Sequence, residues 1–160
     1  MTMIARRLPR LLMAGFLALA LPAAAMAAGG ITSTTGNGTA DSDLDLAKTA
    51  IAQFKYDQAK KYLEKVLALV PDNADALNLM GFTERKLGDP QDSLTYYNKA
   101  LAQNPNHLGA NEYLGELYLE MKDVKKAEER LAVLQQACGG TCEEYQELRE
   151  KIEKFKVASN

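Results

Sequence analysis

The chain has 160 residues, of which 47% are hydrophobic and 25% are charged, and its formal net charge is -2. This length suits one domain and excludes a large multidomain enzyme. The near-neutral charge, the absence of Trp and an aromatic content of 7% exclude an ordinary nucleic-acid binder, which needs basic residues and stacking rings. Two cysteines and one histidine cannot fill a four-ligand zinc site, so we expect no metal and no other cofactor.

The first 27 residues have the three parts of a secretory signal peptide. Three arginines open the segment, residues 11–21 are uncharged and almost wholly apolar, and Ala25 and Ala27 form a small-residue cleavage site. The alternative is an uncleaved membrane anchor, but the apolar run before Pro22 is about half of the roughly 20 residues that span a bilayer. We therefore expect export, cleavage after Ala27, and a periplasmic bacterial protein without stable membrane insertion.

Removal of residues 1–27 changes the character of the chain. Lys plus Arg falls from 19 to 16 while Asp plus Glu stays at 21, so the net charge becomes -5. Residues 28–39 are small, polar and rich in glycine, which predicts a flexible linker. The folded part of the chain is therefore expected to begin at residue 40.

Several residue types then return at intervals of 34 residues. Pro71 and Pro105 are separated by this distance, as are Gly81 and Gly115. A fixed period of this length indicates a stacked array, and apolar residues at helical spacing predict two amphipathic helices in each unit. At each glycine, the missing side chain would let the two helices of one hairpin approach closely. The predicted units are residues 40–73, 74–107 and 108–141.

These units resemble the tetratricopeptide repeat, whose pattern includes Leu-Gly-x2-Tyr in the first helix and Ala-x3-Phe in the second. The third unit supplies Leu114, Gly115 and Tyr118, and then Ala127 with Leu131 in place of Phe. The resemblance implies an all-α fold, a right-handed α-solenoid of three helix hairpins.

Residues 142–160 predict a last helix that caps the array. Its apolar stripe would cover the exposed face of the third unit, as repeat arrays require. The stripe consists of Tyr145, Leu148, Ile152 and Phe155. The charged residues expected to face water are Glu143, Glu144, Glu147 and Lys151.

The third unit ends in a cysteine pair. Gly139 and Gly140 can end one helix in the left-handed conformation, and Thr141 followed by Glu144 predicts a capping box that starts the next. A disulfide between Cys138 and Cys142 would suit an oxidising compartment and would contribute about 2 kcal/mol, because the closed loop is short. The alternative is a redox-active or metal-handling dithiol, although the spacing differs from a C-x-x-C motif.

The resemblance also implies a binding surface, because the first helices of tetratricopeptide hairpins line a concave groove for a peptide or partner helix. The predicted partner contacts are Lys48, Asn78, Phe82, Arg85, Glu112 and Glu116, flanked by Leu44, Ile51, Lys86 and Leu119. An aromatic residue with an arginine one turn on is typical of interface anchors. The alternative for Phe82 is packing against a neighbouring helix.

No nucleophile–base set or phosphate-binding loop is visible, so no catalytic residue is expected. His107, the only histidine, is interpreted as a surface residue of a turn. The sequence thus predicts a non-enzymatic periplasmic adaptor that binds a protein or peptide. The alternative function is a thiol-redox or metal-handling protein that uses Cys138 and Cys142.

Overall fold

The structure is a computed structural model that describes residues 37–159. Within this range the chain forms helices and turns only, and none of the helices is long and apolar enough to cross a bilayer. The predicted signal peptide and residues 28–36 of the predicted linker lie outside the described residues. The helices are α1 (Asn37–Ala52), α2 (Tyr56–Leu69), α3 (Ala74–Leu87), α4 (Pro90–Gln103), α5 (Leu108–Glu120), α6 (Val124–Cys138) and α7 (Glu143–Ala158).

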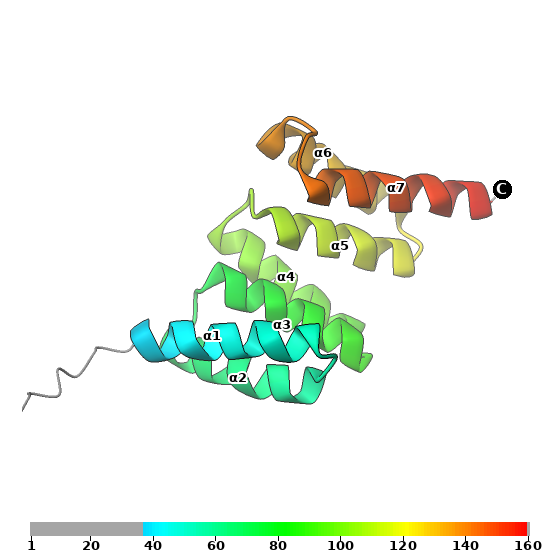
Figure 1. Cartoon of the computed structure of the whole chain (residues 1–160). Helices are drawn as coiled ribbons and strands as arrows, with labels where there is room; N and C mark the ends of the chain where they lie inside the picture. Colours follow the sequence, from blue (N-terminus) through cyan, green and yellow to red (C-terminus); the bar gives the residue numbers. More distant parts are fainter. Residues whose placement is uncertain (1–36, 160) are drawn as a thin grey trace, which may run out of the picture. The chain divides into compact units, whose positions relative to one another are not determined.

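The first six helices form three consecutive hairpins (Figure 1). Helix α1 packs on α2, α3 on α4, and α5 on α6, and each hairpin also contacts the next. Helix α7 packs against both α5 and α6. The prediction of an all-α fold with three helix hairpins and a last helix is therefore confirmed.

Helix α1 begins earlier than the sequence predicted. It starts at Asn37, so the last three residues of the predicted linker 28–39 are helical. The physical reason is the burial of Ala40 and Leu44, which lie one helical turn apart against α2 and α3. A helix that buries Ala40 needs backbone hydrogen bonds in the preceding turn.

The turns between helices carry the capping residues that their sequences allow. Side-chain acceptors hold the first backbone N–H groups of four helices, and Pro90 occupies the first turn of α4, where its missing N–H costs nothing. Gly88 ends α3 with a φ of 92°, a left-handed conformation that glycine adopts without strain. The capping residues are Asn73, Asp89, His107 and Asp123.

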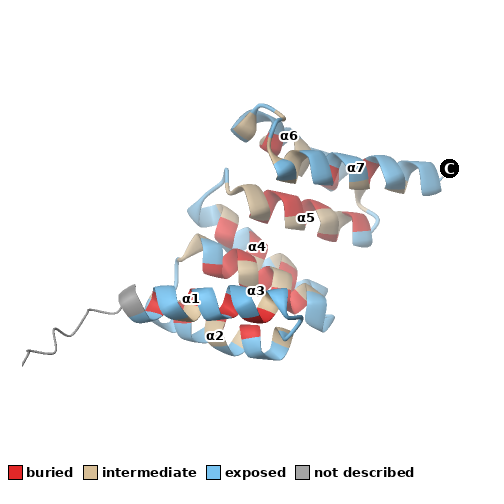
Figure 2. Ribbon diagram, in the orientation of Figure 1, coloured by how far each residue is buried: buried red, intermediate tan, exposed pale blue. Residues whose placement is uncertain are grey.

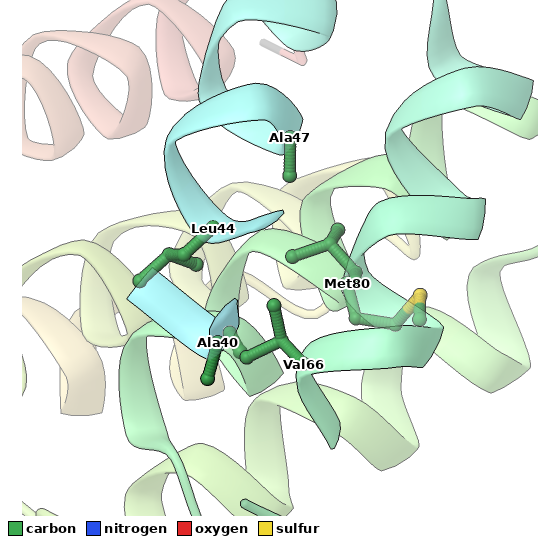
Figure 3. Close-up of a cluster of buried hydrophobic side chains, with 7 residues drawn as sticks. Ala40, Leu44, Ala47, Val66 and Met80 are labelled. Atoms are coloured by element: carbon green, nitrogen blue, oxygen red, sulfur yellow. The ribbon is translucent and has the colours of Figure 1, made fainter. Parts of the chain in front are cut away.

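Burial follows the stacking of the hairpins. Figure 2 shows many buried positions on α3 and α5, which have neighbours on both sides, and a largely exposed α7. The cluster in Figure 3 joins Ala40, Leu44 and Ala47 of α1 to Val66 of α2 and Met80 of α3. The core is thus assembled from adjacent hairpins rather than from distant segments.

Two helix glycines mark close approaches. A Cβ atom at Gly81 would lie 2.7 Å from the Tyr97 ring in the second helix of the same hairpin, as the sequence predicted. A Cβ atom at Gly115 would lie 2.5 Å from Leu148 of α7. The second contact differs from the prediction, because the closest neighbour of Gly115 belongs to the last helix and not to its own hairpin partner.

We expect Gly81→Ala to lower the free energy of unfolding by about 1 to 2 kcal/mol, because Tyr97 is fully buried and its ring cannot retreat. Urea denaturation measures this change. The same substitution in a Tyr97→Leu background should cost less, because the ring that creates the clash is gone. An equal cost in both backgrounds would assign the effect to something other than this contact.

Candidate partner-binding surface

The predicted partner contacts lie on α1, α3 and α5, but they differ in accessibility. Lys48 is exposed on α1 and lies 3.5 Å from the carboxylate of Asp45. Phe82 is half-buried on α3, while Asn78, one turn earlier, is buried. We call this surface the first-helix face.

The side chain of Arg85 is not accessible on the first-helix face. Its side chain is 9% exposed, and it donates hydrogen bonds to the carbonyl oxygen of Tyr113, at 3.2 Å, and to the carboxylate of Glu116. A second carboxylate, that of Glu120, lies 3.4 Å from its Nε atom. The arginine that the sequence assigned to a partner therefore joins α3 to α5 inside the protein.

Glu112 and Glu116 are covered as well. Lys151 of α7 reaches between them, at 3.7 Å from a Glu112 oxygen and in ion-pair contact with Glu116. Its ammonium also lies 3.1 Å from Glu147, one turn earlier on α7. Glu147 and Lys151 keep side chains that are 46% and 42% exposed, in line with the expectation that they face water, but α7 also brings this charged pair against α5.

The crowding of these groups shifts their proton affinities. Burial, the charge of Glu116 and a hydrogen bond with Glu147 raise the pKa of Glu112 to about 8. Burial alone would also raise the pKa of Glu116, but hydrogen bonds from Lys151 and Arg85 outweigh it and lower that pKa. The proton affinities of the two carboxyl groups are therefore driven apart, and Glu112 keeps its proton to a higher pH than Glu116 does.

Glu112, Glu116 and Glu147 are close enough to share a metal ion. The Lys151 ammonium already lies among their oxygens, and Arg85 adds a second positive charge at Glu116. The cations that balance these carboxylates are thus supplied by the protein itself.

A row of side chains on α3 is better placed to meet a partner. Asn78, Phe82 and Lys86 follow one another at intervals of four residues, so they share one side of the helix. Lys86 is exposed, and its ammonium lies 5.2 Å from the centroid of the Phe82 ring. The Oδ1 atom of Asn78 is buried and accepts no hydrogen bond from any residue that the structure describes.

Phe82 also packs within the protein, as the alternative for this residue proposed. Its ring centroid lies 5.1 Å from that of Tyr113 on α5 and 6.4 Å from that of Tyr56 on α2. One side of the Phe82 ring therefore belongs to the hairpin contacts, and the rest lies beside Lys86. The flanking residues Leu44 and Leu119 are buried, and Ile51 is half-buried.

His107 is more than a surface residue. Its Nδ1 atom accepts a hydrogen bond from the Ala110 N–H at 3.2 Å and thereby caps α5. Its Nε2 atom lies 3.0 Å from the Asp75 carboxylate on α3. The side chain, 12% exposed, therefore links two consecutive hairpins, a role that depends on contacts between segments 32 residues apart.

The cysteines occupy the positions that the sequence predicted. Cys138 is the last residue of α6, Cys142 precedes the first residue of α7, and the two form a disulfide with a Cα–Cα distance of 5.9 Å. The predicted capping box is wrong, because Thr141 donates its hydroxyl to the Cys138 carbonyl and Cys142 occupies the cap position of α7. The tight loop turns the Thr141 side chain back toward α6. Redox or metal chemistry at this pair stays a prediction.

A shallow hollow of about 520 Å³ lies on α2, away from the first-helix face. All of its lining residues belong to this single helix, so it does not bring groups from several elements together. The lining residues are Asp57, Gln58, Lys61, Tyr62 and Lys65.

Comparison with protein families gives a consistent result along the described chain. Two models of the tetratricopeptide repeat match it, one over residues 38–105 and the other over residues 84–152. The chain belongs to the tetratricopeptide-repeat family. The recognition made from the residues of the repeats is confirmed.

One curated relative, the uncharacterized protein ycf37 of Pyropia yezoensis, is 32% identical over 99 residues. The match covers 55% of this chain and 54% of that protein. The chain thus spans about half the length of the curated relative that it matches.

Solved structures share the fold at low sequence identity. The Sgt2 tetratricopeptide domain from Aspergillus fumigatus is 20% identical, with a TM-score of 0.68 over 76% of this chain and 81% of that chain. PcrH, solved in complex with the chaperone binding region of PopD, is 16% identical, with a TM-score of 0.67 over 77% and 95% of the two chains.

An O-GlcNAc transferase from Thermobaculum terrenum is 21% identical, with a TM-score of 0.64. The match covers 68% of this chain but 21% of the transferase. A tetratricopeptide array can therefore be one part of a larger enzyme, and membership of the family does not decide whether a protein is catalytic.

Proposed function

We propose that the chain is a non-enzymatic adaptor of the periplasm, exported by its N-terminal segment, that binds a protein segment on the first-helix face. The partner lies across α1 and α3, where Lys48, Phe82 and Lys86 are accessible. Arg85, Glu112 and Glu116 support this surface from within, because their charges are already paired.

The unpartnered Oδ1 atom of Asn78 is the observation that carries this proposal. A buried amide oxygen without a donor is unfavourable, and native proteins rarely retain one without a reason. A backbone N–H of an incoming peptide would supply the missing donor. Phe82, one turn further along α3, would then pack against an apolar side chain of the same peptide.

Gly109 leaves room for the Asn78 side chain. A Cβ atom at residue 109 would lie 3.1 Å from the Nδ2 atom of Asn78 and would press on the amide. The complex of PcrH with a segment of PopD supports the proposal by analogy, because the two chains share the fold. Export to the periplasm rests on the composition of residues 1–27.

A photo-crosslinking residue in place of Phe82 tests the surface in the cells that produce the protein. We expect it to capture one partner, whereas the same residue in place of Lys61, exposed on α2, should not. Purified partner should bind the Asn78→Ala variant about tenfold more weakly than the wild type, because the new hydrogen bond is lost.

Thermal unfolding of the Asn78→Ala variant is the control, and it should stay near the wild-type value because the amide oxygen has no partner to lose. Equal capture from both crosslinking positions would contradict binding on the first-helix face. Unchanged affinity of the Asn78→Ala variant would remove Asn78 from the site.

A further inference from the structure

The hairpin turns contain one residue each with a positive φ, and these residues are 34 apart. They are Phe54, Gly88 and Lys122, with φ values of 58°, 92° and 61°. Glycine adopts this conformation readily, but a bulky aromatic residue does not. Phe54 is nevertheless 78% exposed, and within the described part of the chain its ring contacts one other ring, that of Tyr56 at 6.4 Å. A residue with a strained backbone and a side chain that adds little to the packing indicates a role in binding and not in stability.

The other two turns expose an apolar side chain at nearly the same place. Leu87 is 39% exposed and directly precedes Gly88, and Met121 is 44% exposed and directly precedes Lys122. The C-terminal ends of α1, α3 and α5 lie on the same side of the array, at the right in Figure 1. We call this set of residues the turn edge: Phe54, Lys55, Lys86, Leu87, Met121 and Lys122.

Each apolar residue of the turn edge has a lysine next to it in the sequence. Within residues 37–159, six lysines form no ion pair, and Lys55, Lys86 and Lys122 are three of them, whereas seven lysines do form one. The paired lysines are Lys48, Lys60, Lys65, Lys126, Lys151, Lys154 and Lys156. The Lys55 ammonium donates to the Gln53 side chain at 2.8 Å and the Lys86 ammonium lies over the Phe82 ring, so neither is neutralised by a carboxylate of the described residues.

The nearby carboxylates are mostly engaged. Asp89 caps α4, Asp123 binds Lys126, and Glu120 pairs with Arg85. The other charges of the following turns are Asp57, Asp92 and Lys125, which form no ion pair among the described residues. The six residues of the turn edge thus carry three positive charges and no negative charge, while the negative charges of Asp57, Asp89 and Asp92 lie nearby, in the first turns of the following helices and their caps.

We propose that the turn edge docks on the surface of an anionic phospholipid bilayer. Phe54, Leu87 and Met121 enter the boundary between headgroups and acyl chains, and the adjacent lysines contact lipid phosphates. The docking is peripheral and reversible, and it leaves Asn78 and Phe82 free for a protein partner. It shares Lys86 with the surface proposed above for a protein partner, but it does not depend on that function.

The spacing of the apolar side chains favours a bilayer over a protein. Neighbouring helices lie about 8–10 Å apart, so the three side chains form isolated points along an edge and not a continuous patch. A stable protein interface needs about 800 Å² on each partner and close shape complementarity. A lipid surface needs neither, because its headgroups adapt to each inserted side chain.

The chain contains no Trp, so one introduced Trp reports on one position. We expect the emission of full-length Phe54→Trp to shift to shorter wavelength with vesicles of phosphatidylglycerol and phosphatidylcholine, but not with phosphatidylcholine alone. Leu69→Trp is the matched control, because Leu69 is 51% exposed but ends α2, whose C-terminal end lies on the side opposite the α1 turn (Figure 1). Its emission should not change with either vesicle.

Charge and strain can be tested separately. Lys55→Gln with Lys122→Gln in the Phe54→Trp chain should weaken vesicle binding about 25-fold, at about fivefold for each lysine near an anionic surface. Phe54→Gly should bind about tenfold more weakly than the wild type and unfold at a temperature no lower, because glycine suits the positive φ.

Three results would overturn the proposal. The first is an unshifted Phe54→Trp emission, and the second is an equal shift of Leu69→Trp, which would place the whole chain non-specifically on the vesicle. The third is a shift that needs no vesicles and grows with protein concentration, which would identify a second copy of the chain as the occupant. A clear loss of stability in Phe54→Gly would show that Phe54 stabilises the folded chain, and it would contradict a role for this side chain in membrane contact.

Discussion

Arg85→Ala should lower the free energy of unfolding by about 3 kcal/mol, the cost typical of breaking a buried ion pair by removing one partner. The arginine side chain is 9% exposed and that of Glu116 is 11% exposed, so little water can replace the lost contact. The same variant would also lose the hydrogen bond from Arg85 to the Tyr113 carbonyl. Urea denaturation at neutral pH measures the difference.

The neighbouring residue supplies the control. Lys86→Ala removes an exposed cation that forms no ion pair among the described residues, so its effect should stay within about 0.5 kcal/mol. Glu116→Gln should cost less in the Arg85→Ala background than in the wild type, because the ion pair with Arg85 is already lost and only the contact with Lys151 remains. If Arg85→Ala left stability unchanged and reduced partner capture, Arg85 would be the partner contact that the sequence predicted.

Glu112→Gln should change how stability depends on pH. The pKa of Glu112 is about 8 in the fold, against a usual value near 4.5, so the folded chain holds a proton that the unfolded chain releases. The wild type is therefore stabilised by this proton below about pH 4.5 and loses that stabilisation as the pH rises toward 8. We expect this loss to be about 2 to 3 kcal/mol, because Lys151 and nearby solvent screen the charge.

In the Glu112→Gln variant this loss should be absent, because the amide stays neutral and can still donate to Glu147. The variant should be more stable than the wild type at about pH 8.5 and similar at about pH 5. Urea denaturation at several pH values provides the test. Glu147→Gln is the matched control, because Glu147 is half exposed and is expected to change the profile less. A wild-type profile that is flat between these pH values would contradict a buried proton on Glu112.

Glu116 acts in the opposite direction. Its pKa is lowered in the fold by Lys151 and Arg85, so its contribution is present above the usual carboxyl value and is lost as the pH falls through the folded pKa. Two glutamates one helical turn apart thus have opposed pH dependence. The difference arises from which of them receives the hydrogen bonds of the cations.

The repeat itself was readable from the sequence. Gly81 and Gly115 recur with the period of the array, and the left-handed turn residues Phe54, Gly88 and Lys122 keep the same spacing in the structure. The period of the sequence predicts the arrangement of the hairpins because each hairpin contacts mainly its neighbours. The hairpins therefore follow one another in space in the same order as in the chain. The helices, the hairpins and the last helix follow from this.

The candidate site was only partly readable. Lys48 is exposed and Phe82 is half-buried, so both can meet a partner. In contrast, Arg85, Glu112 and Glu116 are paired within the protein. The signal that could have indicated this is Lys151, four residues after Glu147 on the last helix. Its direction depends on how α7 rotates when Leu148 packs on Gly115.

The sequence by itself determined the period, the helix pairs, the turn residues and the position of the disulfide, because each of these depends on residues close together in the chain. The tertiary structure decided which charges meet across helices. Arg85 and Glu116 are 31 residues apart, and Lys151 and Glu116 are 35 apart. Whether such residues pair or face water depends on the rotation of packed helices, which hydrophobic periodicity fixes only to within a side of the helix. The rotation of the helices therefore decides which charged side chains pair inside the protein and which remain exposed to a partner.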